Sequence, residues 1–206
     1  MGALTEIVPK PLLPNPANSL IRHQIEMLRR HVNHLYVTIG YKKEKLILNL
    51  ENFEVDEFID VDGHGNAYFL NLLNRLPDNS RILVITCDNI MSINLTSLEL
   101  EARSHEVSLI VPKQITDGTI GDFIEHRNGL ISSMQRRTGT GLVASGLQVL
   151  LARDIAILQN GSVNDFSEVW SCLIKRGALR VSNTPINSWW AIDTEDALND
   201  WIESIG

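Results

Sequence analysis

A run of apolar residues that ends in an aspartate constrains the fold of this chain more than any other feature. Residues 81–88 read RILVITCD. Strands that are buried on both faces of a parallel sheet have this near-continuous apolar pattern. We therefore predict a strand over residues 81–90 inside a largely parallel sheet, with Asp88 at the point where the strand emerges from the core.

Other short apolar runs alternate with amphipathic helical patterns. Four prolines between residues 9 and 16 exclude a helix from residues 1–18, which we expect to be irregular. Such alternation predicts an α/β fold of three layers, Rossmann-like, with a mixed, mostly parallel sheet and helices on both faces. The predicted helices cover 19–32, 42–53, 63–76, 95–105, 165–178 and 194–205, and the predicted strands cover 34–41, 53–61, 106–113, 141–152 (broken at Gly146), 188–193 and a hairpin over 121–135.

Length and charge narrow the function classes. The chain has 206 residues, which predicts a single domain, and its 18 basic and 25 acidic residues give a net charge of −7. We therefore expect no nucleic-acid partner. We also expect no membrane span and no secretory signal, because apolar runs stay below about 18 residues. Two cysteines make no disulfide framework. These features predict a cytoplasmic protein.

Two aspartates are candidate metal ligands. In open α/β sheets, ligands bind beyond the carboxyl ends of the strands. Asp88 ends one apolar run, and Asp193 ends the shorter run WWAI in the same way. Two carboxylates at two strand ends could share a hard cation such as Mg²⁺, which is commonly held by one or two carboxylates and substrate phosphates. The alternative interpretation is that each aspartate caps a helix or lies in a turn.

A lysine and a glycine-rich segment are the candidate phosphate and base contacts. Lys10 lies between Pro9 and Pro11, in a segment that the prolines stiffen, and its ammonium suits a phosphate. A solvated loop lysine is the alternative. Glycines in the segment VDGHGNA, residues 61–67, allow close approach of a ligand to the backbone before a predicted helix.

The order of these features resembles that of the sugar-1-phosphate nucleotidyltransferases. The resemblance runs through LTEIVPKPLLP (4–14), YVTIGY (36–41), GNA (65–67), VITCDN (84–89), SGLQVL (145–150) and WAIDTEDAL (190–198). It implies transfer of a nucleoside monophosphate from a nucleoside triphosphate to a sugar 1-phosphate or similar phosphorylated alcohol, with release of pyrophosphate. Mg²⁺ is the implied cofactor, and these two substrates are the implied partners.

The resemblance also assigns roles to individual residues. Lys10 matches the lysine that contacts the nucleotide phosphates, and with Asp88 it forms the implied catalytic pair. Asp88 and Asp193 match the metal ligands. The implied nucleotide-binding residues are Lys10, Gly65, Asn66 and Cys87, and the implied substrate-binding residues are Gln135, Arg136, Gly146 and Trp190.

Three departures from the family pattern leave alternatives open. The family begins with a central strand and a glycine-rich loop that wraps the triphosphate, and this chain matches only the tail of that motif, so it resembles an N-terminally truncated domain. Asn66 and Cys87 replace a threonine and a glycine, and Gln135-Arg136 replaces a Glu-Lys pair. One alternative is therefore a non-catalytic relative that binds a nucleotide sugar or a partner protein. A second is an internal start with the missing segment upstream, and a third, more distant, is a GT-A type glycosyltransferase. Exposed sheet edges would also favour a homo-oligomer.

Overall fold

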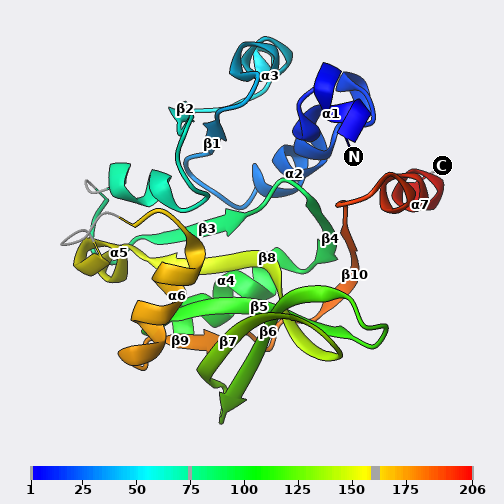
Figure 1. The fold of residues 1–206 in the computed structure, drawn as a ribbon. Coiled ribbons are helices and arrows are strands. Elements are labelled where there is room, and N and C mark those ends of the chain that lie inside the picture. Colours follow the sequence, from blue (N-terminus) through cyan, green and yellow to red (C-terminus); the bar gives the residue numbers. More distant parts are fainter. Residues whose placement is uncertain (1, 74–75, 159–162, 206) are drawn as a thin grey trace. The chain divides into compact units, whose positions relative to one another are not determined.

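The computed structural model describes residues 2–73, 76–158 and 163–205 (Figure 1). Their contacts fall into two compact units. Unit 1 comprises Met1–Gly63, Cys87–Met91 and Trp189–Gly206, and unit 2 comprises His64–Thr86 and Ser92–Ser188. The organisation of the whole chain as one domain stays a prediction.

Unit 1 combines a small parallel sheet with helices from both ends of the chain. β1 and β2 pair in parallel, with Tyr36 opposite Glu57. The Ser19 hydroxyl accepts a hydrogen bond from Arg22 N and caps α2, as the sequence predicts. The elements that lie wholly in this unit are α1 (Gly2–Ile7), the 3₁₀ helices η1 (Lys10–Leu12) and η2 (Pro16–Asn18), α2 (Leu20–Leu28), β1 (Tyr36–Ile39), α3 (Lys43–Leu50), β2 (Glu57–Asp60) and α7 (Glu195–Ile205).

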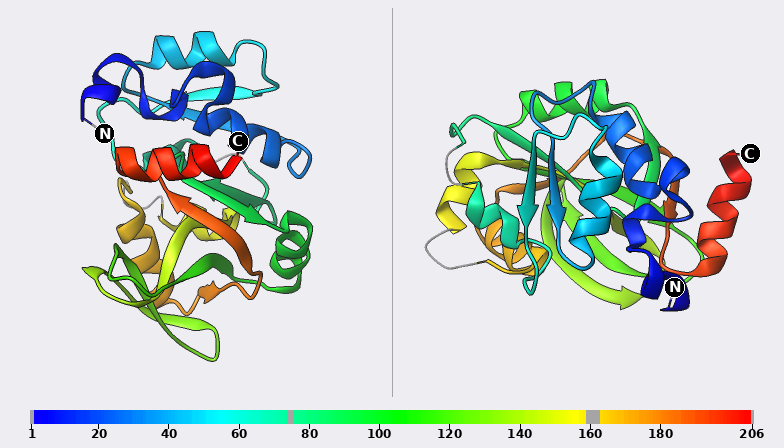
Figure 2. Two further views of the ribbon diagram at one scale, coloured as in Figure 1. Left: turned by 90° about the vertical axis from the view of Figure 1, so that its right-hand side faces the viewer. Right: turned by 90° about the horizontal axis from the view of Figure 1, so that it is seen from above.

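Unit 2 is a six-stranded sheet, in the order β3-β8-β5-β9-β7-β6, with helices on both faces. Figure 2 shows α4 on one face of this sheet and α5 and α6 on the other. The elements that lie wholly in this unit are the 3₁₀ helix η3 (Tyr68–Leu72), β3 (Arg81–Ile85), α4 (Leu95–Ser104), β5 (Ser108–Ile115), β6 (Ile120–Arg127), β7 (Leu130–Thr138), β8 (Gly141–Leu151), α5 (Ala152–Leu158), α6 (Phe166–Lys175) and β9 (Leu179–Val181).

Two further strands, β4 (Asn89–Ile93) and β10 (Ile186–Ala191), pair with each other. Each strand has residues in both units. The run that we predicted as one strand over 81–90 is therefore two strands, β3 and β4, separated by a turn at Cys87–Asp88.

The α/β class is confirmed, but the strand directions differ from the expectation. Only the β1–β2 and β5–β9 pairings are parallel among those with a described register. β8 runs antiparallel to β3, β5 and β6. β3 lies at the end of the strand order, and three of its apolar residues are only partly buried: Ile82, Leu83 and Ile85.

Two helical expectations were wrong. Residues 1–18 are not irregular throughout, because α1 ends before the first proline, and Pro11 and Pro16 sit in the first turns of η1 and η2, where no amide donor is needed. The helix predicted over 63–76 is only the short η3, and residues 74–75 lie outside the described residues. The sequence reading also missed α5.

Turn chemistry was predicted correctly at two places. The β6–β7 hairpin turns at Asn128 and Gly129, both with positive φ, as a two-residue turn with Asn-Gly requires. α6 ends at Lys175, and Gly177 follows in the turn with a φ of +64°, where Ala178 N donates to Leu173 O. Gly146, with φ of +86°, lies where the pairing of β5 with β8 shifts register.

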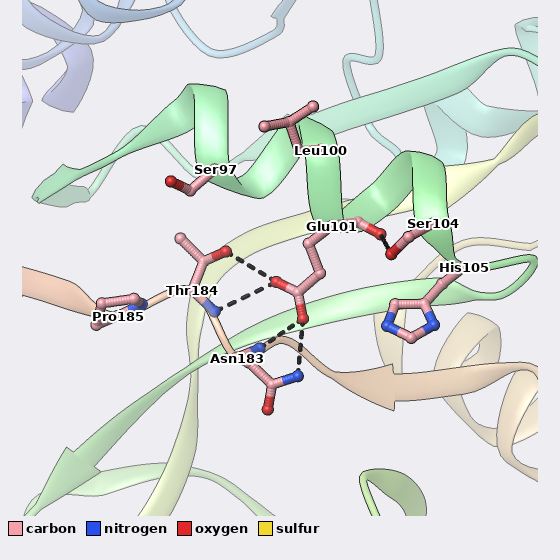
Figure 3. Close-up of a pocket in the computed structure, with 8 residues that line it drawn as sticks. All are labelled: Ser97, Leu100, Glu101, Ser104, His105, Asn183, Thr184 and Pro185. Atoms are coloured by element: carbon pink, nitrogen blue, oxygen red, sulfur yellow. Dashed lines mark hydrogen bonds between the residues drawn. The ribbon is translucent and has the colours of Figure 1, made fainter.

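Glu101 joins α4 to the segment that follows β9 (Figure 3). Its carboxylate accepts hydrogen bonds from the hydroxyls of Ser182 and Thr184 and from the backbone amides of Asn183 and Thr184. Burial opposes ionisation of Glu101, but these hydrogen bonds outweigh it and hold its pKa below the usual value. The ionised carboxylate therefore stabilises this connection.

We expect Glu101→Gln to lower the free energy of unfolding by about 1–2 kcal/mol at neutral pH, because the amide offers one accepting oxygen and no charge. The lowered pKa means that this contribution is present above pH 4.5 and is lost as pH falls through the folded-state value. Urea unfolding of wild type and variant from pH 7 to pH 3 should show the gap closing in acid. Glu99→Gln, on the same helix but in an exposed pair with Arg103, is the control.

Candidate functional site

Lys10 lies at the centre of a charged cluster in unit 1. The residue begins η1, between Pro9 and Pro11, and its side chain is 24% exposed. Its Nζ donates hydrogen bonds to Asp88 Oδ2 at 3.1 Å and to Asp193 Oδ1 at 3.0 Å. The three predicted residues therefore converge on one point, although 78 and 183 residues of sequence separate Lys10 from the two aspartates.

A backbone hydrogen bond brings the two aspartates together. Ile192 N donates to Asp88 O at 2.8 Å, next to the pairing of β4 with β10. Asp193 follows Ile192 directly, and the hydroxyl of Thr194 accepts from Ala197 N at the start of α7. Asp88 thus lies in a turn, as its alternative reading had it, and also faces a cation. The metal-ligand role of Asp88 stays a prediction.

An apolar cluster in unit 1 supports these loops. Trp201, Ile192 and Ile90 are all at most 1% exposed. Ile90 and Ile192 lie two and one residues from the aspartates Asp88 and Asp193. The cluster consists of Leu13, Leu20, Ile90, Ile192, Leu198 and Trp201, with Leu4, Trp190 and Ile202 packed against it.

The two aspartates keep Lys10 charged. Burial alone would lower the pKa of Lys10, but Asp88 and Asp193 outweigh it and raise the pKa above its usual value. Desolvation, with the nearby charge of Asp88, raises the pKa of the Cys87 thiol to about 12. Cys87 is therefore a neutral thiol at physiological pH and not a nucleophile.

The cluster fits a hard divalent cation. Asp88 and Asp193 already direct one oxygen each at the same positive charge, the Lys10 ammonium. Oxygen from one or two carboxylates, completed by water and phosphate, is the donor set that Mg²⁺ favours. Among the described residues, no group of three His, Cys, Asp or Glu side chains could hold a metal. A cation here would take its other ligands from a phosphorylated substrate or water.

Two residues that the sequence analysis did not single out, Asn89 and Gln24, hold Asp88 or the backbone beside it. Asn89 Nδ2 donates to Asp88 Oδ1 at 3.0 Å, and Gln24 Nε2 donates to Asn89 O at 3.0 Å. Gln24 is 5% exposed on the apolar face of α2. A polar side chain in an otherwise apolar helical stripe was the available signal, since buried amides need a partner.

Gly65 and Asn66 are packed against the start of α6 within unit 2. Gly65 N donates to Asn164 Oδ1 at 2.8 Å, and Asn66 Oδ1 accepts from Phe166 N at 3.1 Å. A Cβ on Gly65 would lie 2.4 Å from Asn164 O. The requirement for glycine at this position is thus explained by packing inside the chain, and its role at a nucleobase stays a prediction.

Of the remaining predicted residues, Gln135, Arg136 and Gly146 belong to unit 2, and Trp190 belongs to unit 1. Gln135 and Arg136 are neighbours on β7 and face opposite sides of the strand, with Arg136 paired to Asp122 at 3.2 Å. Gly146 O accepts from Thr86 N. Trp190 packs, partly buried, against the apolar cluster. Substrate contacts by these four residues stay predictions.

A surface hollow of about 510 Å³ borders α4 in unit 2 and contains none of the predicted residues (Figure 3). Its polar wall is the Glu101 connection described above, whose carboxylate is already hydrogen-bonded within the chain. The hollow is lined by Ser97, Leu100, Glu101, Ser104, His105, Asn183, Thr184 and Pro185.

None of the described helices is long and apolar enough to cross a bilayer.

Comparison with curated proteins finds archaeal relatives. The chain is 36% identical to the bifunctional protein GlmU of Methanococcus maripaludis strain C7 over 201 residues, which cover 91% of this chain and 46% of that protein. It is 34% identical over 67 residues to the bifunctional protein GlmU of Methanocaldococcus jannaschii, covering 31% of this chain and 16% of that protein. The chain thus spans less than half the length of these relatives. No family model matches it.

Solved structures share the fold. The CTP:phosphocholine cytidylyltransferase of Streptococcus pneumoniae matches with a TM-score of 0.78 and 22% identity, covering 100% of this chain and 93% of that one. The putative glucose-1-phosphate thymidylyltransferase of Bacillus anthracis matches with a TM-score of 0.80 and 18% identity, covering 97% of this chain and 87% of that one. The chain therefore shares its fold with these two proteins and is similar in sequence to the GlmU proteins.

Removal of the Lys10 ammonium should expose the cation-binding character of the cluster. We expect Lys10→Met to lower the free energy of unfolding by about 1 kcal/mol without divalent metal, because two carboxylates then face each other unpaired. Mg²⁺ should raise the melting temperature of this variant more than that of wild type. The raised pKa of Lys10 means that its contribution is present below pH 10.5 and is lost as pH rises through the folded-state value.

Lys43→Met is the matched control for that measurement, because it removes an ammonium from a single exposed carboxylate, Asp60. Thermal unfolding with and without Mg²⁺ compares the two variants. Equal Mg²⁺ shifts in Lys10→Met, Lys43→Met and wild type would contradict a cation site at the cluster.

Gly65→Ala tests the packing of residues 65–66 on α6. The added methyl group would meet backbone and side-chain atoms of Asn164 and Asp165 within 2.8 Å, and we expect a loss of about 1–3 kcal/mol in unfolding free energy. At Gly40 the nearest atom to such a methyl group is 3.7 Å away, so Gly40→Ala should be tolerated. Urea unfolding measures the stability of both variants. Equal stability would show that Asn164 moves away from the added methyl group at no cost in free energy.

Proposed function

We propose that this chain is a Mg²⁺-dependent nucleotidyltransferase that joins a nucleoside monophosphate to a sugar 1-phosphate or a similar phosphorylated alcohol. The observation that carries the proposal is the convergence of Lys10, Asp88 and Asp193 on one point. Sequence similarity to the GlmU proteins and the shared fold support the reaction class. The names of three structural neighbours include phosphocholine, glucose 1-phosphate and inositol 1-phosphate, which supports a phosphorylated alcohol as the acceptor.

The reaction needs positive charge at the α-phosphorus, where one P–O bond forms and another breaks. An oxygen of the acceptor phosphate attacks the α-phosphorus in line and forms a new P–O bond. The bond between the α-phosphorus and the oxygen that bridges to the β-phosphate breaks, and pyrophosphate leaves with the electron pair. Negative charge grows on the oxygens around the α-phosphorus and on the leaving group, so a fixed cation lowers the barrier.

Each of the three charged residues has a task in this scheme. Asp88 and Asp193 would hold the metal through the oxygens that now contact Lys10. Bound Mg²⁺ supplies charge neutralisation at the phosphate oxygens. Lys10, released from the two carboxylates, would direct its ammonium at a phosphate oxygen. A lysine ammonium has a usual pKa of 10.5 and is protonated at neutral pH without the two carboxylates.

The compartment follows from the substrate and from the thiols. Nucleoside triphosphates are cytoplasmic metabolites, and Cys87 and Cys172 are both free. Free thiols persist in reducing compartments. We therefore place the proposed reaction in the cytoplasm.

Pyrophosphate release tests the proposal. Each nucleoside triphosphate is paired with a panel of sugar 1-phosphates, inositol 1-phosphate and phosphocholine, with Mg²⁺. We expect turnover with at least one pair, and a loss of about 100-fold or more in Asp88→Asn, Asp193→Asn and Lys10→Met. Asp200→Asn, at an exposed position of α7, is the control.

Two results would overturn the assignment. One is the absence of pyrophosphate release from every pair, and the other is turnover that survives in Asp88→Asn. Tight binding of a nucleotide sugar without Mg²⁺-dependent turnover would instead support the non-catalytic binding protein.

A further inference from the structure

We propose that Asn89 and Gln24 are positioning residues that fix the Asp88 carboxylate so that its Oδ2 is the oxygen offered to the metal. The inference rests on the proposed metal role of Asp88. Neither residue contacts the Lys10 ammonium through a described hydrogen bond. Both act through Asp88 or through the backbone beside it.

The Asn89 side chain distinguishes the two oxygens of Asp88. Its Nδ2 donates to Oδ1 at 3.0 Å, while Lys10 Nζ lies 3.1 Å from Oδ2. A carboxylate that accepts an amide hydrogen bond on one oxygen is restrained in rotation about its χ2 angle, and the other oxygen is kept toward the cation. Side chains that hold metal ligands in this way set both the orientation and the affinity of the site.

Gln24 fixes the backbone on which Asn89 is carried. Its Nε2 donates to Asn89 O at 3.0 Å from α2, and the side chain is 5% exposed. Burial of an amide costs free energy unless its hydrogen bonds are made. Its neighbours on this face of α2 are Leu20, Ile21, Ile25 and Leu28, all buried. An apolar side chain would fill this place at lower cost, so the amide is explained by the carbonyl that it holds.

Three hydrogen bonds together restrain Asp88 and the backbone beside it. Ile192 N holds the Asp88 carbonyl, Gln24 holds the next carbonyl along the chain, and Asn89 holds the carboxylate itself. Asp193 lies one residue beyond Ile192, and its side chain is 71% exposed. Among the described hydrogen bonds, its carboxylate accepts only from Lys10. Asp88 is therefore the rigid ligand of the pair and the one whose placement controls metal affinity.

Mn²⁺ binding to the full 206-residue chain tests the proposal without any need for turnover. The electron paramagnetic resonance signal of free Mn²⁺ is followed during titration of wild type, Gln24→Met and Asn89→Leu. Gln24→Met keeps the length of the side chain, Asn89→Leu keeps its branching, and both remove the amide donor. We expect the dissociation constant for Mn²⁺ to rise about 10-fold or more in each variant. At saturating Mn²⁺, turnover should return, because the two residues position the ligand and do not react.

Two controls separate positioning from general stability. Ile25→Val removes a methylene group from the same buried face of α2, and Asn49→Ala removes an amide that donates to Lys45 O within α3. Both should bind Mn²⁺ within about twofold of wild type, and thermal unfolding of all five proteins is measured alongside. If one test variant fails to fold, the Mn²⁺ affinity of the other still tests the proposal, because Gln24 and Asn89 belong to different elements.

The results distinguish this inference from the proposed function. Wild-type affinity for Mn²⁺ in a folded Gln24→Met or Asn89→Leu variant overturns the positioning role, and so does a wild-type chain that binds no Mn²⁺ at millimolar concentration. Weakened Mn²⁺ binding in the test variants alone supports it. Binding of Mn²⁺ by wild type without pyrophosphate release from any substrate pair overturns the nucleotidyltransferase assignment and leaves the positioning role standing.

Discussion

The hydrogen bond from Ile192 N to Asp88 O is the contact on which the charged cluster depends. It joins a turn in the middle of the chain to the segment before the last helix, and Lys10 then reaches both aspartates from the N-terminal region. Like charges do not gather without a cation between them, so the ammonium and the backbone hydrogen bond act together. The apolar cluster around Trp201 packs beneath both loops and restrains them.

The charged residues could be predicted because they leave local signals. Asp88 and Asp193 each end an apolar run, and prolines flank Lys10. The strand-end positions of the two aspartates suggested a shared cation, but the approach of Lys10 to them was implied only by the resemblance to a family, since nothing local relates position 10 to position 193. Gln24 and Asn89 were missed because an amide carries no charge signal, and its role appears only when α2 meets the backbone after Asp88.

Strand direction was the main feature that the sequence could not supply. An apolar run such as that of β3 reports burial, but antiparallel pairing with β8 depends on how the chain returns after β5 and the hairpin. The helix α5 was missed because it begins directly after β8 and its seven residues are too few to show a clear helical period. Prolines were read as helix breakers, although the first turn of a helix accepts them.

The ion pairs of Lys10 carry a consequence for how a metal would be acquired. Two carboxylates and one ammonium leave the cluster with a residual single negative charge, so the loops can assemble during folding before any metal arrives. Entry of a divalent ion would then be an exchange of cations and not the filling of an empty cage. The ammonium would be set free at the moment when a triphosphate needs a counterion, which couples metal loading to substrate capture through a single side chain.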